Sequence, residues 1–243
     1  MNNMVMKELK NFDISIEDAG TEKVMVSELL MGEKCLTFLQ NQMNEINAPN
    51  LAVTASMVSK RYAFLVVSST LYCIVKFNCA PGLSIYTCAL SNERKLSIQS
   101  MTCKWWEMDH MDREQWREKA LHDLFSLHIT PFLNILNQSS RVSLSILWEN
   151  VAIRINSIYR KTLEKELDPV KIERLKSDFH FLKNANGALF NLKENPIKKF
   201  LKIGEELKSN PYRKTCCMYY RLEKGVEGIG YCSNCPVKRK QTK

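Results

Sequence analysis

Four cysteines near the C-terminus are the residues of this 243-residue chain whose type and spacing indicate chemistry. Cys216 and Cys217 are adjacent, and Cys232 and Cys235 form a C-x2-C pair after an interval of fourteen residues. Two residues between thiols let the backbone turn so that both sulfurs face one metal ion. Four thiolates complete the ligand set of a [2Fe–2S] cluster, a [4Fe–4S] cluster or a tetrahedral zinc ion. The spacing therefore predicts a metal site and leaves the metal open.

The adjacency of Cys216 and Cys217 favours an iron–sulfur cluster over zinc. Neighbouring side chains diverge in regular structure, so two adjacent thiols do not readily chelate a single ion. A binuclear cluster has two metal centres and spreads its ligands over a larger volume. Pro236, directly after Cys235, matches the Cys-Pro ending of some iron–sulfur motifs. Two unconnected pairs of free thiols are the third alternative.

The other potential ligands are assigned no metal chemistry. A lone cysteine among apolar neighbours usually packs as a small hydrophobic residue, which is our interpretation of Cys35, Cys73, Cys79, Cys88 and Cys103. The histidines lack ligand-like spacing; they are His110, His122, His128 and His180. A nicotinamide or flavin site is not predicted either, because no G-x-G-x-x-G follows a strand pattern and no P-loop is present.

Positive charge is concentrated at the C-terminal end. The net charge is +9, and residues 198–243 contain twelve basic and four acidic residues, so the preceding part is nearly neutral. Such a localised field attracts an anion, whether nucleic acid, an acidic protein, an anionic lipid surface or a small ligand. The basic residues that flank the cysteines are candidates for steering this anion: Arg213, Lys214, Arg221, Lys238, Arg239 and Lys240. For residues 238–240, a solvated terminus is the alternative interpretation.

The C-terminal motif resembles that of the FhuF-type ferric-siderophore reductases. The similar stretches are residues 213–222, which contain the adjacent cysteines, and residues 231–236, which contain the C-x2-C pair. Weaker similarity at residues 56–62 and 146–150 extends the resemblance over roughly residues 50–243. The family motif has ten residues between its cysteine pairs where this chain has fourteen. The glycine-rich stretch 225–230 can accommodate the difference, because lengthening a loop costs little entropy.

The resemblance implies that Cys216, Cys217, Cys232 and Cys235 ligate a [2Fe–2S] cluster. It also implies an enzyme, a ferric-siderophore reductase that passes one electron to siderophore-bound Fe(III) and releases Fe(II) in the cytoplasm, with no catalytic residue beyond the cluster. The implied partners are an anionic ferric siderophore of the citrate or hydroxamate type and an external electron donor, such as a ferredoxin-like or flavin-containing carrier. Nucleic acid is not expected. The alternatives are a zinc-stabilised basic module that binds nucleic acid or protein, and a non-redox siderophore-binding protein with a structural cluster.

The chain is expected to work in the cytoplasm. Its N-terminus has no apolar segment behind a basic start, so no secretory signal is predicted. Uncharged stretches such as residues 62–75 are shorter than the ~18 apolar residues that span a bilayer, so no transmembrane helix is expected. In a reducing compartment, cysteines are buried thiols, metal ligands or catalytic groups rather than disulfides.

The elements that must position these cysteines are mostly helices. Apolar residues at helical spacing, with cap and proline signals, predict helices over residues 27–46, 112–127, 144–165 and 168 to about 184–187. Residues 51–77 are expected to form one buried helix or a broken pair, and Thr130-Pro131 to begin a further helix. Alternation at residues 83–86 and 96–99, around a polar turn at 91–94, predicts a hairpin.

The predicted fold is α+β and mostly helical, with a small antiparallel hairpin or sheet packed against helices and a C-terminal iron–sulfur extension. We expect a poorly ordered leader over residues 1–24 and a mixed helical body over residues 25–197. Residues 198–243 form the basic segment that carries the four cysteines.

Overall fold

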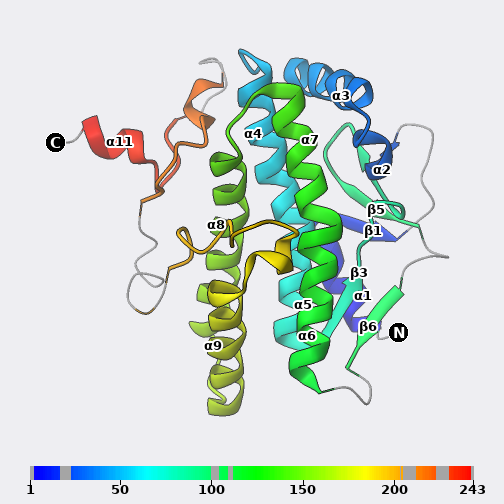
Figure 1. Ribbon diagram of the computed structural model, residues 1–243, viewed down its shortest axis with the longest axis vertical. Helices are drawn as coiled ribbons and strands as arrows, with labels where there is room; N and C mark the ends of the chain where they lie inside the picture. Colours follow the sequence, from blue (N-terminus) through cyan, green and yellow to red (C-terminus); the bar gives the residue numbers. More distant parts are fainter. Residues whose placement is uncertain are drawn as a thin grey trace.

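The computed structural model confirms the mostly helical α+β fold (Figure 1). It describes residues 3–16, 23–99, 104–108, 112–202, 204, 212–222 and 230–241. Long helices pack against one another along the molecule, a small mixed sheet lies on one side of them, and the cysteine-bearing segments lie on the other (Figure 1).

The central helix is continuous from residue 51 to residue 77. It consists of α4 (Leu51–Tyr62), a π-helical stretch η1 (Ala63–Ser68) and α5 (Ser69–Phe77). The Asn50 side chain caps it by accepting a hydrogen bond from the Val53 amide at 3.1 Å. Of the two alternatives that the sequence allowed, one buried helix or a broken pair of helices, the structure has the single helix. Its length and composition would allow it to cross a membrane, but 78% of its most apolar window is buried inside the molecule, as in a core helix.

A second long helix covers residues 113–140. It joins α6 (Arg113–His122), a π-helical stretch η3 (Asp123–Ile129) and α7 (Thr130–Ser140). The prediction that a separate helix begins at Thr130 is therefore wrong. Proline at residue 131 lacks an amide hydrogen and crowds the preceding turn, and the wider π-helical turns before it accommodate both effects without ending the helix.

Helices α8 (Leu144–Leu163) and α9 (Pro169–Asn184) begin where the sequence predicts. The Ser143 hydroxyl accepts from the Ser145 amide at 3.2 Å, and the Asp168 carboxylate accepts from the Val170 amide at 2.9 Å. Helix α8 contacts α4, η1, α7 and α9, so it occupies the centre of the helical layer.

The N-terminal region is more ordered than the sequence suggests. Residues 3–16, within the predicted leader, form helix α1 (Asn3–Lys10) and strand β1 (Ile14–Ile16). Val5, Leu9 and Phe12 are buried, because spacings of four and three residues place them on one side of the chain. The helix predicted over 27–46 is divided into α2 (Val26–Leu29) and α3 (Gly32–Glu45).

The larger sheet has four strands in the order β1-β5-β4-β2. Its other members are β2 (Lys23–Met25), β4 (Cys88–Ser91) and β5 (Leu96–Ile98). The hairpin exists, but its first strand is β4 and not residues 83–86, where Ser84 instead accepts turn hydrogen bonds from the Thr87 and Cys88 amides. The sheet is mixed rather than antiparallel, because β1 pairs in parallel with β5.

A separate two-stranded ribbon pairs β3 (Cys79–Gly82) with β6 (Lys104–Glu107). Short helices complete the chain: η4 (Gly187–Phe190), η5 (Tyr219–Arg221) and α11 (Pro236–Gln241). The main core extends to Phe200 and Leu201, slightly beyond the predicted end of the body at residue 197. Val53 and Met57 of α4 form a second, small apolar cluster with Cys217 and Leu222. The segment with the adjacent cysteines is therefore packed directly on α4.

Candidate metal centre

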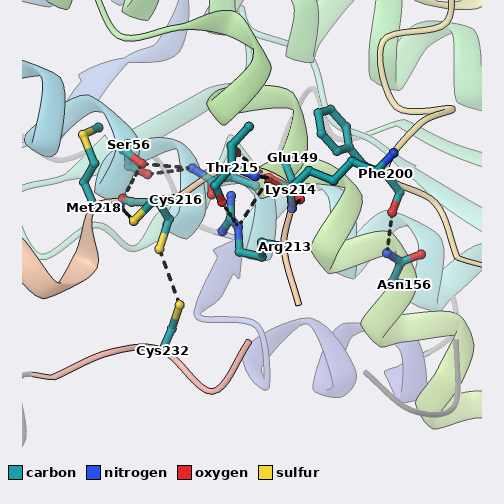
Figure 2. A network of polar contacts seen from close by, with 12 residues as sticks. Ser56, Glu149, Asn156, Phe200, Arg213, Lys214, Thr215, Cys216, Met218 and Cys232 are labelled. Atoms are coloured by element: carbon teal, nitrogen blue, oxygen red, sulfur yellow. Dashed lines mark hydrogen bonds and ion pairs between the residues drawn. The ribbon is translucent and has the colours of Figure 1, made fainter. Parts of the chain in front are cut away.

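A buried carboxylate on α8 fixes the chain just before the adjacent cysteines. Glu149 is 2% exposed, and its two oxygens accept the amides of Lys214 and Thr215, each at 2.7 Å. The Thr215 hydroxyl also donates to it, and Arg213 Nε lies 3.6 Å from Oε2. Figure 2 shows these groups converging on Glu149. A buried carboxylate needs such partners, so this contact both satisfies Glu149 and positions residues 213–215.

Helix α4 holds the backbone of Cys217 from the other side. The buried Ser56 hydroxyl donates to the Cys217 carbonyl at 2.8 Å. Asn150, next to Glu149 on α8, donates to the Ser56 carbonyl at 3.0 Å and to the Ser59 hydroxyl at 2.8 Å. One polar network therefore connects two packed helices to the adjacent cysteines (Figure 2).

The C-x2-C pair is joined to the same structure through the backbone. The Arg213 amide donates to the Asn234 carbonyl at 2.9 Å, which links the two cysteine segments. The Cys235 amide donates to the Cys232 carbonyl at 3.0 Å and closes the turn between the two thiols. Pro236 then begins α11, a position that suits proline because the first helical amide has no intrahelical partner.

The four predicted ligands lie together as two cross-pairs. The sulfurs of Cys217 and Cys232 are 3.9 Å apart. Electrostatic interactions connect Cys216 with Cys235 and with Cys217, and Cys232 with Cys235. Each thiol thus interacts with one neighbour in its own segment and one in the other. Cys217 and Cys235 are buried, whereas Cys216 and Cys232 are partly exposed.

Local interactions give the thiols different acidities. The hydrogen bond with Cys232 lowers the pKa of Cys217 to about 5, with further lowering by the charges of Lys60 and Arg213, against the opposing effect of burial. The same hydrogen bond raises the pKa of Cys232. Burial raises the pKa of Cys216, although the Met218 amide donates to its sulfur at 3.3 Å. A thiolate is the form that binds metals, and cations and amide donors around the sulfurs stabilise it.

The separation of the Cys217 and Cys232 sulfurs fits two ligands of one metal ion. Two thiolates on one tetrahedral ion lie roughly 3.8 Å apart, given metal–sulfur distances of about 2.3 Å. The Cys217–Cys232 separation of 3.9 Å meets this requirement. A mononuclear site would need all four sulfurs at this separation. Among the described residues, no three His, Cys, Asp or Glu side chains are grouped closely enough to hold one ion.

The predicted steering residues have different positions. Arg213 is 5% exposed and bonds to Glu149 and, through Nε at 3.1 Å, to the Thr215 carbonyl. It is therefore a buried structural residue, and its assignment as a surface steering group is corrected. Lys214, Arg221 and Lys238 are exposed near the cysteines. The side chains of Arg239 and Lys240 lie outside the described residues, as do Cys103, His110 and most of the glycine-rich stretch.

Sequence reasoning did not identify the side chains that position the thiols, Ser56, Glu149 and Asn150, or the lysine beside them, Lys60. Lys60 lies 4.8 Å from the centroid of the Tyr219 ring and acts electrostatically on Cys217 and Cys232. Tyr220 and Tyr231, one from each cysteine segment, stack with centroids 5.2 Å apart. The only available signals were the weak similarities at residues 56–62 and 146–150, which contain Ser56, Lys60, Glu149 and Asn150.

A cavity of about 860 Å³ lies elsewhere, lined by residues that include Thr70, Leu83 and His128. Thr70 is fourteen residues beyond Ser56 on the central helix, which corresponds to roughly 20 Å. A ligand in this cavity would not touch the four thiols. Comparisons with protein-family models and with curated proteins find no match to this chain, so the case for the site depends on its own residues.

Proposed function

We propose that the chain is a ferric-siderophore reductase whose four C-terminal cysteines hold a [2Fe–2S] cluster. The observation that carries the proposal is the pairing of thiols from the two segments: the Cys217 and Cys232 sulfurs are 3.9 Å apart, and Cys216 interacts electrostatically with Cys235. Each pair would hold one iron, which explains how adjacent cysteines can serve as ligands: Cys216 and Cys217 belong to different metal centres. Four thiolates are the full ligand set of such a cluster.

When bound, the cluster would supply one electron at a time to an external Fe(III) chelate. Reduction of Fe(III) to Fe(II) releases the iron, because siderophore oxygens retain the softer, less charged ion poorly. The chain's own residues hold the thiols and leave one edge accessible: Cys216 and Cys232 are partly exposed, while Cys217 and Cys235 face the interior. A chelate therefore needs only to approach this edge. The electron would be replaced by a separate donor, a ferredoxin-like or flavin-containing carrier in the cytoplasm.

Metal content and spectra test the cluster. Protein purified without oxygen should contain two irons and two sulfides per chain, absorb visible light, and give an electron paramagnetic resonance signal after reduction by dithionite. Cys216→Ser and Cys232→Ser should lose or distort these spectra. Cys35→Ser is the matched control, because Cys35 is buried in the main core and not in the small apolar cluster that contains Cys217. A colourless protein that contains zinc would contradict the proposal.

Electron transfer is tested separately. Reduced protein, freed of dithionite, is mixed with a ferric siderophore while a ferrous chelator traps Fe(II). One Fe(II) should form per reduced cluster, with simultaneous return of the oxidised spectrum. A cluster that stays reduced in the presence of ferric chelates would indicate a structural role and refute the reductase activity.

A further inference from the structure

A group of cations with too few carboxylate partners lies beside the cysteines, on the two helices that position them and on the adjacent β4–β5 turn. Lys60 of α4 connects this group to the site, because it contacts the Tyr219 ring and its charge acts on Cys217 and Cys232. Arg154 of α8 donates from Nη2 to the Lys60 carbonyl at 3.5 Å. Lys60 and Arg154 thus lie next to each other at the α4–α8 contact.

Two guanidinium groups share one aromatic ring in this region. The Cζ atoms of Arg61 and Arg154 lie 5.4 Å and 5.3 Å from the centroid of Phe64. Arg61 also donates from Nε to the Arg94 carbonyl at 3.0 Å, which places the β4–β5 turn beside it. Stacking on an aromatic ring holds a guanidinium plane in a fixed orientation and leaves its hydrogen-bond donors available.

The carboxylates around these cations are too few to neutralise them. Asp13 pairs with Arg61 at 2.7 Å, and Glu149 pairs with the neighbouring Arg213 at 3.6 Å. Within the described part of the chain, no ion pair involves Lys60, Arg94 or Arg154, although Glu45 acts on Arg94 from a distance. Together, Lys60, Arg61, Arg94 and Arg154 carry an excess of three positive charges over Asp13.

Arg154 is the most unusual of these residues. Its Nε is buried and has no hydrogen-bond partner, and its side chain is only partly exposed. Burial, and then the charges of Arg61 and Arg213, lower its pKa. Keeping a guanidinium half-buried, unpaired and beside other cations costs free energy. An anion that supplies carboxylate oxygens would remove this cost, since carboxylates bind guanidinium groups through paired hydrogen bonds.

We infer that Lys60, Arg61, Arg94 and Arg154 form a docking surface for a carboxylate-bearing ferric chelate of the citrate type. This inference rests on the proposed function and narrows its substrate. A citrate-type chelate carries several carboxylates and a net negative charge, which match guanidinium donors and an excess of cations. A neutral trihydroxamate chelate offers neither feature. Docking at Lys60 would bring the iron of the chelate toward Cys232, which lies at the accessible edge of the site.

The test compares two chelates on reduced protein. The rate of cluster oxidation is measured by rapid mixing with ferric citrate and with a neutral ferric trihydroxamate, at low and high salt. The double variant Arg94→Gln/Arg154→Gln should slow the ferric citrate reaction on the order of tenfold at low salt and weaken its salt dependence. The rate with the neutral chelate should stay unchanged. Lys161→Gln is the matched control, because it removes an exposed charge from α8 about two turns beyond Arg154.

A redox-inert probe measures binding itself. Gallium(III) citrate, titrated into the oxidised protein, should bind more weakly to Arg154→Gln than to the wild type or Lys161→Gln, and Arg154→Lys should be intermediate because lysine keeps the charge but not the paired donors. Equal ferric citrate rates in the double variant and the Lys161 control would overturn the inference, as would an equal loss with the neutral chelate. A variant that slows reduction of the cluster by an acidic ferredoxin, but not its oxidation by ferric citrate, would assign the surface to the electron donor instead. Normal cluster spectra and a normal trihydroxamate rate in these variants keep the reductase proposal separate from this result.

Discussion

Replacing Glu149 by glutamine should release the segment that carries the adjacent cysteines without unfolding the main body. The carboxylate accepts two amide hydrogen bonds at 2.7 Å, accepts the Thr215 hydroxyl and faces Arg213. Glutamine has nearly the same shape, but it lacks the charge and turns one acceptor into a donor. That donor would point at an amide or at the guanidinium, so at least one buried group would lose its partner.

The magnitude follows from these contacts. A hydrogen bond to a charged group contributes about 1.5–3 kcal/mol, and removing one partner of a buried ion pair costs about 3–5 kcal/mol. Because glutamine retains one acceptor oxygen, we expect a loss of about 3 kcal/mol in the free energy of opening the segment. This corresponds to roughly a hundredfold increase in the open population. The effect should stay local, because the main apolar core does not include residues 213–217.

Hydrogen exchange measures this opening directly. In Glu149→Gln, the amides of Lys214 and Thr215 should exchange roughly a hundredfold faster, and iron content should fall. Amides in the centre of α8 should keep their protection. Glu149→Asp keeps the charge and should be milder, and Glu164→Gln, an exposed glutamate just after α8, serves as the matched control. Unchanged exchange at residues 214 and 215 in Glu149→Gln would refute the anchoring role of this carboxylate.

Three further predictions concern other parts of the molecule. His128 is buried between the Tyr62 hydroxyl and the Leu83 carbonyl, and burial lowers its pKa to about 4 from 6.5. Because the unfolded chain binds this proton more tightly, the free energy of unfolding should decline by about 3 kcal/mol as the pH falls from 6.5 toward 4, and His128 should cause no loss above pH 6.5. Denaturant unfolding measures this pH dependence, which should be absent in His128→Gln. Asn150→Ala should cost about 1–3 kcal/mol of unfolding free energy, because the Ser59 hydroxyl loses the amide that donates to it and the Ser56 carbonyl keeps only the Ser59 hydroxyl as a side-chain donor. Asn184→Ala, on an exposed helix end, should cost less than about 1 kcal/mol. Gly187→Ala should lower the thermal midpoint by several degrees, because a Cβ there would lie 2.2 Å from the Leu192 carbonyl oxygen, whereas Gly32→Ala, which meets open space, should not.

Sequence reasoning succeeded where the signal is local. Helices α8 and α9 follow from an apolar stripe and from caps at Ser143 and Asp168, all within a few residues of one another. Sequence reasoning failed where a contact with a residue far away in the sequence determines the local structure. Thr130 has the sequence of a cap, yet its hydroxyl donates to the Phe190 carbonyl at 2.8 Å inside a continuous helix. Residues 83–86 alternate like a strand, but they form a turn beside a strand that starts at Cys88.

The candidate site also combines features that local sequence reveals with features that depend on distant contacts. The cysteines were identifiable because their spacing is a property of a short segment. Glu149 was not, because a glutamate within an amphipathic helix has the pattern of a surface residue, and its partners follow 65 and 66 residues later. Arg213 was misassigned for the same reason: its proximity to the cysteines in sequence suggested a surface charge, and the buried carboxylate that pairs with it belongs to another element.

The contact between α4 and α8 connects the anchoring of the thiols with the cationic surface. On α4, Ser56 holds the Cys217 carbonyl, and Lys60 follows one turn later. On α8, Glu149 holds residues 214 and 215, and Arg154 follows five residues later. Because both helices contribute to both features, a change in their packing must move the thiols and the cations together. A substitution at this contact, such as Asn150→Leu, which removes the hydrogen bonds from α8 to Ser56 and Ser59 of α4, should therefore perturb the cluster spectrum and the salt dependence of ferric citrate reduction in parallel. If the two readouts changed independently, the thiols and the cations would not share one structural support.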